Sequence, residues 1–250
     1  MGKFFTVEIK PTMPIATQIE DDKTDMVFGA NDVVFDWMAF DIPKGAAKLT
    51  DIQCIWRGSL TPKGLEFYFA KSMPDTPGTA PSSIGTGNAT AGGTGYYKNI
   101  IGVVDMVTTD FRDTTLDNLT VGNTQGTQDN SMNIVLEGTP DSGTNVGYDK
   151  LYVAATVTAG SGWNTSTGVL ADGAVTLGSA SNFDVKTVDA INFFDVGDVV
   201  HVHDSETAIG TIKSLTASNI VLEAATGVAI ADEDEIMNIN PIKLVLSFEK

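Results

Sequence analysis

Short segments in which apolar and polar residues alternate dominate the sequence, and this pattern is typical of β-strands that bury one face. They are rich in Val, Ile, Phe, Tyr and Thr and span 4–9, 32–42, 49–56, 64–71, 99–107, 132–137, 150–158 and 242–249. Turn-forming residues separate them, as in 42–46, 61–64 and 138–147. The best helical candidate, 180–194, is rich in β-branched and polar residues, so we expect at most one helical turn there. The sequence therefore predicts an all-β protein.

The strand pattern changes near residues 159–168, a stretch rich in Gly, Ser and Thr. Beyond it the strands are shorter and joined by tight turns, as in small SH3-like or OB-like barrels, with Gly197-Asp198 and Ser218-Asn219 placed at two hairpin turns. The last segment, 242–249, has the length and pattern of the strands that precede the change. We therefore predict a jelly-roll-like β-sandwich formed by 1–159 and 238–250, with a small β-barrel, 160–237, inserted into it.

Two polar stretches are predicted to be loops. Residues 72–95 are dense in Gly, Pro, Ser and Thr and contain almost no large apolar residue. They are expected to form either a mobile surface loop or an arm that becomes ordered on a partner. Residues 122–131 are similarly polar and shorter, and a second loop is expected there.

Acidic residues outnumber basic ones, since 32 Asp and Glu against 15 Lys and Arg give a formal net charge of −17. Binding to nucleic acid or to an anionic membrane needs clustered Lys and Arg, so we expect neither partner. A basic or neutral protein surface is compatible with this charge. The single cysteine, Cys54, allows no intrachain disulfide and lies in the apolar run IQCIW, which predicts a buried core residue.

The chain contains two histidines, His201 and His203, which are followed at once by Asp204. On a strand the two imidazoles share one face and could bind one metal ion. The chain has no third histidine, so further ligands would have to be nearby carboxylates, namely Asp198, Asp204 and Glu206. The favoured interpretation is a half-exposed strand face whose neighbouring valines pack inward.

No segment of the sequence identifies an active site. The G-x-S-x-G turn of a serine hydrolase is absent, and 85–90 begins as G-x-G but lacks the third glycine and the following helix of a dinucleotide site. The acidic segments 19–25 and 231–236 do not match a calcium-binding loop, so solvated acidic loops are favoured over cation sites. We therefore assign no catalytic, cofactor-binding or metal-binding residue and predict a protein that is not an enzyme.

The sequence contains several distinctive phrases: VVFDWMAFDIPKGAAKL, TAGGTGYYKNIIGVVD, GTNVGYDKLYVAA, VGDVVHVHD and the closing ADEDEIMNINPIKLVLSFEK. In these phrases, which are spread over most of the chain, it resembles the virion structural proteins of tailed bacteriophages, most closely those of marine and cyanobacterial phages. The resemblance implies a homo-oligomeric subunit on the surface of a symmetric capsid, with the major capsid protein or other virion proteins as partners. A capsid decoration protein is the favoured role, and a tail, neck or fibre-associated protein is the alternative.

A carbohydrate- or host-surface-binding module is the competing class, because β-sandwiches commonly bind ligands through their loops. Trp163 and the pair Tyr96-Tyr97 could stack on sugar rings, or they could pack in the interior. The aromatic residues of the strands are predicted to form the sandwich core, with an exposed partner surface as the alternative; they are Phe35, Trp37, Phe40, Trp56, Phe67, Tyr68 and Phe69.

Overall fold

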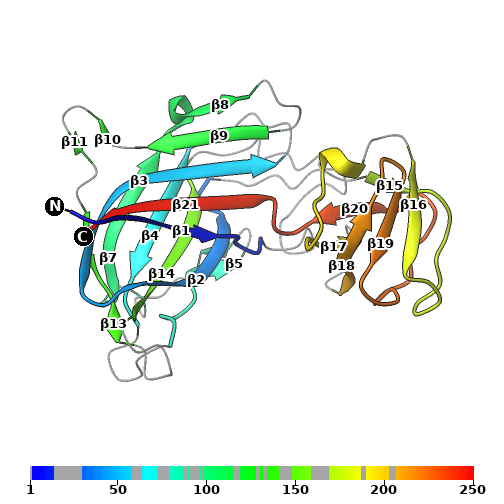
Figure 1. Ribbon diagram of the computed structural model, residues 1–250, viewed down its shortest axis with the longest axis horizontal. Coiled ribbons are helices and arrows are strands. Elements are labelled where there is room, and N and C mark those ends of the chain that lie inside the picture. The colour runs from blue at the N-terminus through cyan, green and yellow to red at the C-terminus, as the bar shows by residue number, and fades with distance from the viewer. Residues whose placement is uncertain are drawn as a thin grey trace.

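The computed structural model describes residues 2–13, 30–57, 64–72, 79–86, 89–90, 96, 98–114, 119–124, 126–127, 130–131, 134–140, 148–158, 169–186, 190–202 and 207–250. Strands dominate these residues, whose only helical segments are two 3₁₀ turns, η2 (Thr108–Asp110) and η3 (Ala190–Asn192). Within the same residues, no helix has the length and hydrophobicity needed to cross a bilayer. A two-layer sandwich and a smaller barrel lie at opposite ends of the long axis (Figure 1). The predicted all-β fold is confirmed.

The first layer of the sandwich, which we call sheet A, is a six-stranded antiparallel sheet. Its strands lie in the order β1 (Phe4–Ile9), β21 (Ile242–Glu249), β3 (Ala46–Arg57), β9 (Leu119–Thr124) and β8 (Phe111–Asp113). A further strand, β12 (Ile134–Glu137), pairs with the first residues of β3. The long strand β3 therefore has β21 on one side and β9 and β12 in succession on the other.

The second layer, sheet B, has five strands. Its central strand is β14 (Tyr148–Val157), which pairs with β2 (Val33–Pro43) on one side and with β4 (Leu65–Ala70) on the other. The strand β7 (Ile100–Met106) continues the sheet beyond β4, and β13 (Thr139–Pro140) pairs with the first residues of β14. Two small hairpins complete the sandwich, β5 (Gly85–Thr86) with β6 (Ala89–Thr90) and β10 (Gly126–Thr127) with β11 (Asn130–Ser131).

The chain passes between the two sheets in the order of a jelly roll. Along sheet A the strands are β1-β21-β3-β9, and along sheet B they are β2-β14-β4-β7. The last strand of the chain, β21, therefore lies between the first strand and β3 (Figure 1). The barrel strands follow β14 and precede β21 in the sequence, so the barrel is inserted between the last strand of sheet B and the last strand of sheet A.

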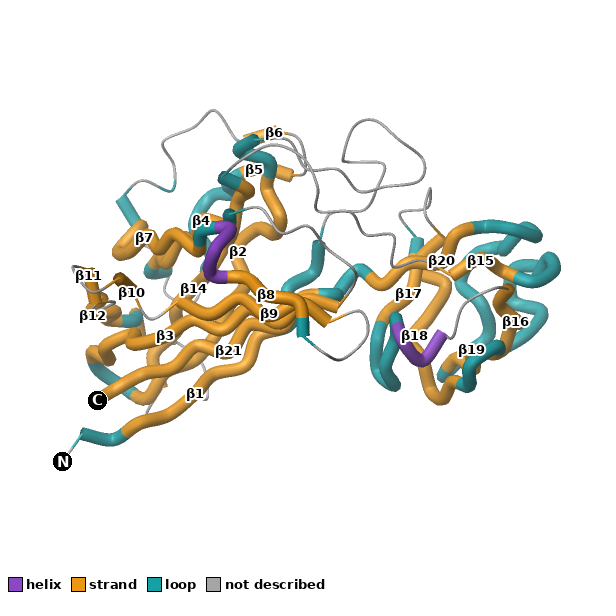
Figure 2. The backbone as a smooth tube through the Cα atoms, turned by 90° about the horizontal axis from the view of Figure 1, so that it is seen from above, coloured by secondary structure: helices purple, strands orange, loops and turns teal. Residues whose placement is uncertain are grey.

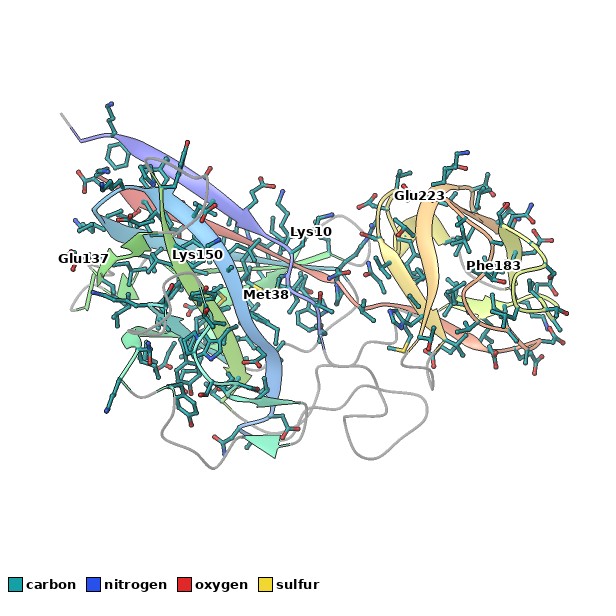
Figure 3. The ribbon with its side chains drawn as sticks, turned by 90° about the horizontal axis from the view of Figure 1, so that it is seen from below. Lys10, Met38, Glu137, Lys150, Phe183 and Glu223 are labelled. Atoms are coloured by element: carbon teal, nitrogen blue, oxygen red, sulfur yellow. The ribbon has the colours of Figure 1, made fainter. Side chains whose placement is uncertain are left out.

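The sandwich core lies between the two sheets and forms because the strands alternate. In β21 every second residue is buried, and Met38 of β2 points into the space between the layers (Figure 3). Among the predicted core aromatics, five are buried there: Phe35, Phe40, Trp56, Phe67 and Phe69. The other two, Trp37 and Tyr68, are half-buried on the outer face of sheet B.

The barrel closes through six strands. They are, in spatial order, β15 (Val169–Ala171), β16 (Asn182–Lys186), β19 (Asn219–Leu222), β18 (Ala208–Leu215), β17 (Val199–Val202) and β20 (Glu235–Asn238). A separate apolar cluster fills it, and Phe183 points into this interior (Figure 3). The predicted fold class, a β-sandwich with an inserted small β-barrel, is confirmed. The exact limits of the two domains stay a prediction, since 159–168 lie outside the described residues.

Two local predictions differ from the structure, and a third is confirmed. The predicted loop at 122–131 is wrong at its start, because β9 continues to Thr124 and alternation buries its threonines despite their polarity. The prediction of at most one helical turn in 180–194 is confirmed for its described residues, which contain the turn η3 and the strand β16. The turn at Gly197-Asp198 leads into β17 rather than joining two strands of a hairpin, with Gly197 at φ 92°.

The predicted loop 72–95 is described only in part. Residues 73–78, 87–88 and 91–95 lie outside the described residues, so its mobility stays a prediction. The described part packs on sheet B: Ile84 is buried, its N–H donates to the Asp36 carboxylate at 3.1 Å, and the Trp37 indole N–H donates to the Ser82 carbonyl at 2.9 Å. This part of the segment is therefore held against β2.

Candidate functional site

His201 lies on the predicted face of its strand but is more buried than the sequence predicted. His201 is only 6% exposed, instead of lying on a half-exposed face. His201 pairs with Met237 of β20, whose side chain belongs to the sandwich core, whereas Val200 and Val202 pack in the barrel interior. Alternation therefore holds as predicted, and the face of β17 that carries His201 is buried rather than half-exposed. His203, Asp204 and Glu206 lie outside the described residues, and within the part that is described no cluster of three His, Cys, Asp or Glu side chains could hold a metal ion.

Cys54 lies in the sandwich core, as predicted. Its side chain is fully buried, and this burial raises the pKa of the thiol to about 12. A thiol with so high a pKa is almost wholly protonated near neutral pH, whereas nucleophilic attack and metal binding require the thiolate. Cys54 is therefore a packing residue.

The acidic segment 231–236 surrounds a lysine of the barrel. The Lys186 ammonium lies 2.6 Å from the Asp232 carboxylate and 3.4 Å from that of Glu233. The hydrogen bond from Lys186 holds the pKa of Asp232 below its ordinary value, and the Gly173 N–H adds a second bond at 2.9 Å. An ion pair thus neutralises part of the acidic loop that the sequence predicted. The other acidic segment, 19–25, lies outside the described residues.

The outer face of sheet B presents a small aromatic cluster. Trp37, Tyr68 and Tyr96 are half-buried there and pack against Val33, Ile84 and Ala154. The Tyr68 hydroxyl donates to the Glu66 carboxylate, and burial raises the pKa of the Tyr68 hydroxyl to about 12. Because Tyr96 is half-buried in this cluster, one side of its ring packs against it and the other side is accessible. The remaining aromatic candidates for sugar stacking, Tyr97 and Trp163, lie outside the described residues.

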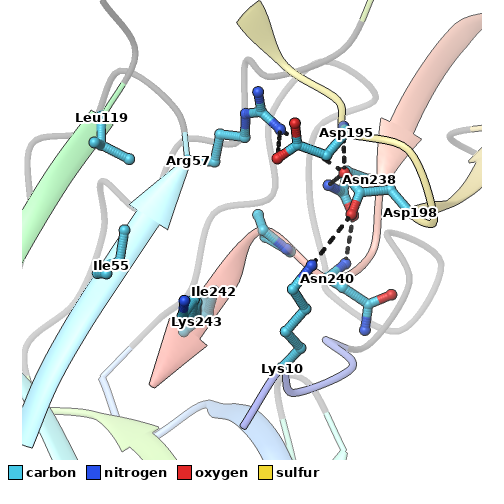
Figure 4. A pocket seen from close by; sticks show the side chains of 11 residues that line it. Lys10, Ile55, Arg57, Leu119, Asp195, Asp198, Asn238, Asn240, Ile242 and Lys243 are labelled. Atoms are coloured by element: carbon cyan, nitrogen blue, oxygen red, sulfur yellow. Dashed lines mark hydrogen bonds and ion pairs between the residues drawn. The ribbon is translucent and has the colours of Figure 1, made fainter. Parts of the chain in front are cut away.

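A pocket of about 320 Å³ lies between the sandwich and the barrel (Figure 4). Its walls combine apolar residues from the ends of sandwich strands with polar residues from both parts. We call six of its polar residues the junction: Lys10, Arg57, Asp195, Asp198, Asn238 and Asn240. Lys10 follows β1 on the side of the sandwich that faces the barrel (Figure 3).

Arg57, the last residue of β3, reaches the barrel with its whole guanidinium group. One terminal nitrogen lies 2.6 Å from the Asp195 carboxylate. The other terminal nitrogen donates to the Ile191 carbonyl at 3.1 Å, and Nε donates to the Asn192 carbonyl at 3.3 Å. These three acceptors lie in one short segment that runs from η3 towards β17, so a single side chain binds this part of the barrel at three points. Figure 4 shows the contact with Asp195.

Asp198 is the most buried charged group of the junction, at 5% exposure. One carboxylate oxygen accepts hydrogen bonds from the Asp195 N–H and from the Asn238 amide, both at 2.8 Å. The other oxygen lies 3.9 Å from the Lys10 ammonium, a contact between barrel and sandwich. Arg57 lies 3.9 Å from the first oxygen. Burial raises the pKa of the Asp198 carboxyl, although the Asp195 N–H and the cations Lys10 and Arg57 oppose the rise. The sequence offered Asp198 as a metal ligand, but the structure places it in an interdomain ion pair.

The connector from the barrel to β21 is bonded to the sandwich on both sides. The Asn240 amide donates to the Pro11 carbonyl and to the Thr12 hydroxyl, both at 3.1 Å. The Arg57 N–H donates to the Pro241 carbonyl at 2.9 Å. The polar groups of the junction are thus engaged with one another across the two parts. This chemistry suits positioning of the barrel rather than a reaction.

Sequence reasoning had missed Arg57 and Asp195 entirely. A usable signal was present, because Arg57 directly follows the apolar run IQCIW in a chain that has few basic residues. An arginine in that position either ends a strand in solvent or meets a carboxylate. Only the fold shows that Asp195, far away in the sequence, is that carboxylate.

No family model matches the chain, and no curated protein matches it. Among solved structures it is similar to the crystal structure of the infectious bursal disease virus VP2 subviral particle, with a TM-score of 0.22 and 8% identity over 99% of this chain and 41% of that chain. The structure of the infectious bursal disease virus Gx strain gives a TM-score of 0.15 and 9% identity at the same coverage. The chain spans less than half the length of either protein, and similarity at this level carries no argument about function.

Proposed function

We propose that the chain is a non-enzymatic structural component of a bacteriophage virion, and specifically a capsid decoration protein that stabilises the major capsid lattice. The observation that supports this most is a jelly-roll sandwich with a second β-domain fixed at one end by the junction (Figure 2). A subunit of this shape can contact a particle with one part and hold the other part at a set distance and orientation.

The fold alone supports several functions, since jelly rolls occur in viral capsid domains, lectins and cupins. Two features favour assembly. The net charge of −17 suits a basic or neutral protein partner. The barrel is bonded at several points rather than joined by a free linker, which matters for a subunit repeated in one orientation on a symmetric particle.

A direct test is the protein inventory of purified particles. Quantitative mass spectrometry is expected to find the chain at a copy number comparable with that of the major capsid protein. The purified chain is also expected to co-sediment with capsids that lack it and to raise their resistance to heat. A copy number typical of a tail or neck component would redirect the proposal to those sites, and absence from particles would refute it.

A carbohydrate-binding module is the second candidate, and the aromatic cluster on sheet B favours it. Trp37, Tyr68 and Tyr96 keep part of their ring surface accessible next to polar groups of Glu66 and Thr156. Aromatic faces beside hydrogen-bonding groups are suited to sugar rings. Binding of the purified chain to a glycan array, and its loss in Tyr68→Ala, would favour this class. A negative array together with capsid binding would exclude it.

A further inference from the structure

β1 forms the outer edge of sheet A. It pairs with β21 at six consecutive positions without a register shift, and no described residue pairs with its opposite edge. The residues that face outward, Phe4, Thr6 and Glu8, are exposed, and Phe4 is 74% exposed. A strand edge of this kind offers its backbone hydrogen-bonding groups to a further strand.

The pairing with β21 determines which backbone groups are free. Lys3 and Lys250 exchange both of their backbone hydrogen bonds, each at 2.9 Å. Hydrogen-bonded and non-hydrogen-bonded positions alternate along an antiparallel pair, so the odd-numbered residues of β1 also bond to β21. The even-numbered residues Phe4, Thr6 and Glu8 therefore direct their N–H and C=O groups away from the sheet.

The other edges of the sandwich have features that discourage strand addition. β2 has register shifts against β14, ends at Pro43 and is held by the segment around Ile84. β7 has a register shift against β4, and the edge strands β8, β12 and β13 are only three, four and two residues long. β1 has none of these features, because FFTVEI contains no proline and no glycine and pairs regularly.

The charge around β1 also differs from that of the whole chain. Residues 2–13 contain Lys3, Lys10 and Glu8 as their charged side chains, a net charge of +1 in a chain of −17. Two copies that approach each other at this edge avoid most of the repulsion that acidic surfaces would produce elsewhere.

We propose that a second copy of this chain binds at this edge, with the two β1 strands antiparallel and a two-fold axis at Thr6. In this register Thr6 lies opposite its symmetry mate and Phe4 lies opposite Glu8, so every free donor and acceptor of the edge is used. On the inner face Phe5 lies opposite Val7, an aromatic and β-branched pair. Both side chains are half-buried against the sandwich core and would be covered further.

A second copy fits this edge better than an unrelated strand, because the pairs repeat on both sides of the two-fold axis. Each free position of β1 meets a free position of the other β1, and each Phe5 meets a Val7. This self-complementarity is the property of an isologous dimer contact. The proposal is independent of the proposed function, since it concerns the purified chain alone.

The first test is the mass of the full-length chain without a tag, measured by sedimentation equilibrium. We expect the mass to rise with protein concentration towards that of a dimer, twice 26.4 kDa. Thr6→Pro removes an N–H that does not bond to β21, so the variant should fold and remain monomeric. Thr6→Val keeps that N–H and should still dimerise. A monomeric wild type, or a Thr6→Pro variant that folds and dimerises like the wild type, would overturn the proposal.

The second test fixes the register and does not depend on a proline. Residues that face each other as a hydrogen-bonded pair lie about 5.5 Å apart between Cα atoms, within reach of a disulfide. Thr6→Cys should therefore give a covalent dimer on mild oxidation. Phe4→Cys, whose opposite residue is Glu8, should not. The native thiol of Cys54 is buried and should contribute no background. Cross-linking of Phe4→Cys but not of Thr6→Cys would refute this register.

Discussion

Replacement of Arg57 by alanine tests whether the junction couples the barrel to the sandwich. The change removes the ion pair with Asp195 and the hydrogen bonds to two barrel carbonyls, while leaving the apolar residues of β3 in place. A hydrogen bond to a carbonyl contributes about 1 kcal/mol net, and an ion pair with an exposed carboxylate contributes about 0.5 kcal/mol. We therefore expect Arg57→Ala to lower the free energy of unfolding by about 2–3 kcal/mol.

Urea unfolding measures this loss, and hydrogen-exchange mass spectrometry locates it. Exchange should rise in 191–202 and 235–241, whereas β4 and β14 in the other sheet should be unaffected. Arg57→Lys keeps the charge but cannot reach three acceptors with one ammonium group, so most of the loss should remain.

Lys71→Ala is the matched control for Arg57→Ala. Lys71 pairs with Glu137 at 3.4 Å, and the Glu137 side chain is 69% exposed, the same fraction as that of Asp195. This pair lies away from the barrel, so its removal should cost less than about 0.5 kcal/mol. If Arg57→Ala and Lys71→Ala have the same stability and the same exchange pattern, the junction does not couple the two parts.

Three further outcomes are expected. Gly122→Ala should lower stability by about 1–3 kcal/mol in urea unfolding, because a Cβ would lie 2.6 Å from the Phe111 ring; wild-type stability would contradict this packing. Asp198→Ala should lower the free energy of unfolding by about 2–4 kcal/mol, because it leaves two donors without an acceptor. Asp198→Asn keeps an acceptor and should cost less than about 1 kcal/mol. Equal losses in the two variants would contradict the role of Asp198 as the acceptor of these two hydrogen bonds. Burial raises the pKa of Cys54 from its ordinary 9.0 to about 12. Between these pH values the folded chain keeps a thiol proton that the unfolded chain releases, so the free energy of unfolding should fall as the pH rises. Cys54→Val should show a smaller fall, measured by urea unfolding across that range, and an equal fall would assign the effect to other groups.

The strands of the sandwich could be predicted because their burial has a simple period. In 242–249 every second residue is apolar, and the structure buries those residues between the two sheets. The strand β9 was missed because its buried positions include Thr120 and Thr124, which read as polar. Its Gly122 reads as a turn residue, yet glycine is required there by the close approach of Phe111. In β9 the neighbouring elements determine the strand more than its own composition does.

The junction could not be predicted because its contacts join residues that are distant in sequence. Arg57 and Asp195 are ordinary surface residues when each is considered alone, and they meet only after the jelly roll brings the end of β3 to the barrel. His201 shows the same limit. Alternation correctly placed its side chain on the face opposite Val200 and Val202, but that face is buried at the point where Met237, the partner of His201 in β20, packs in the sandwich core. No local pattern specifies such a contact with a distant part of the chain.

The place of the insertion explains why a bonded junction matters for the proposed role. The barrel is followed by β21, and β21 is an inner strand of sheet A, paired with β1 along one side and with β3 along the other. A force on the barrel is therefore transmitted along β21 and is resisted by two ladders of hydrogen bonds at once. The junction adds a second connection, because Arg57 ends β3 and bonds to the barrel directly. If the β1 edge also binds a second copy, the same sheet continues into the neighbouring subunit, so the barrel is linked through sheet A to the dimer contact. A decoration protein needs this continuity, because it stabilises a shell only when contacts made by one part resist displacement of the other.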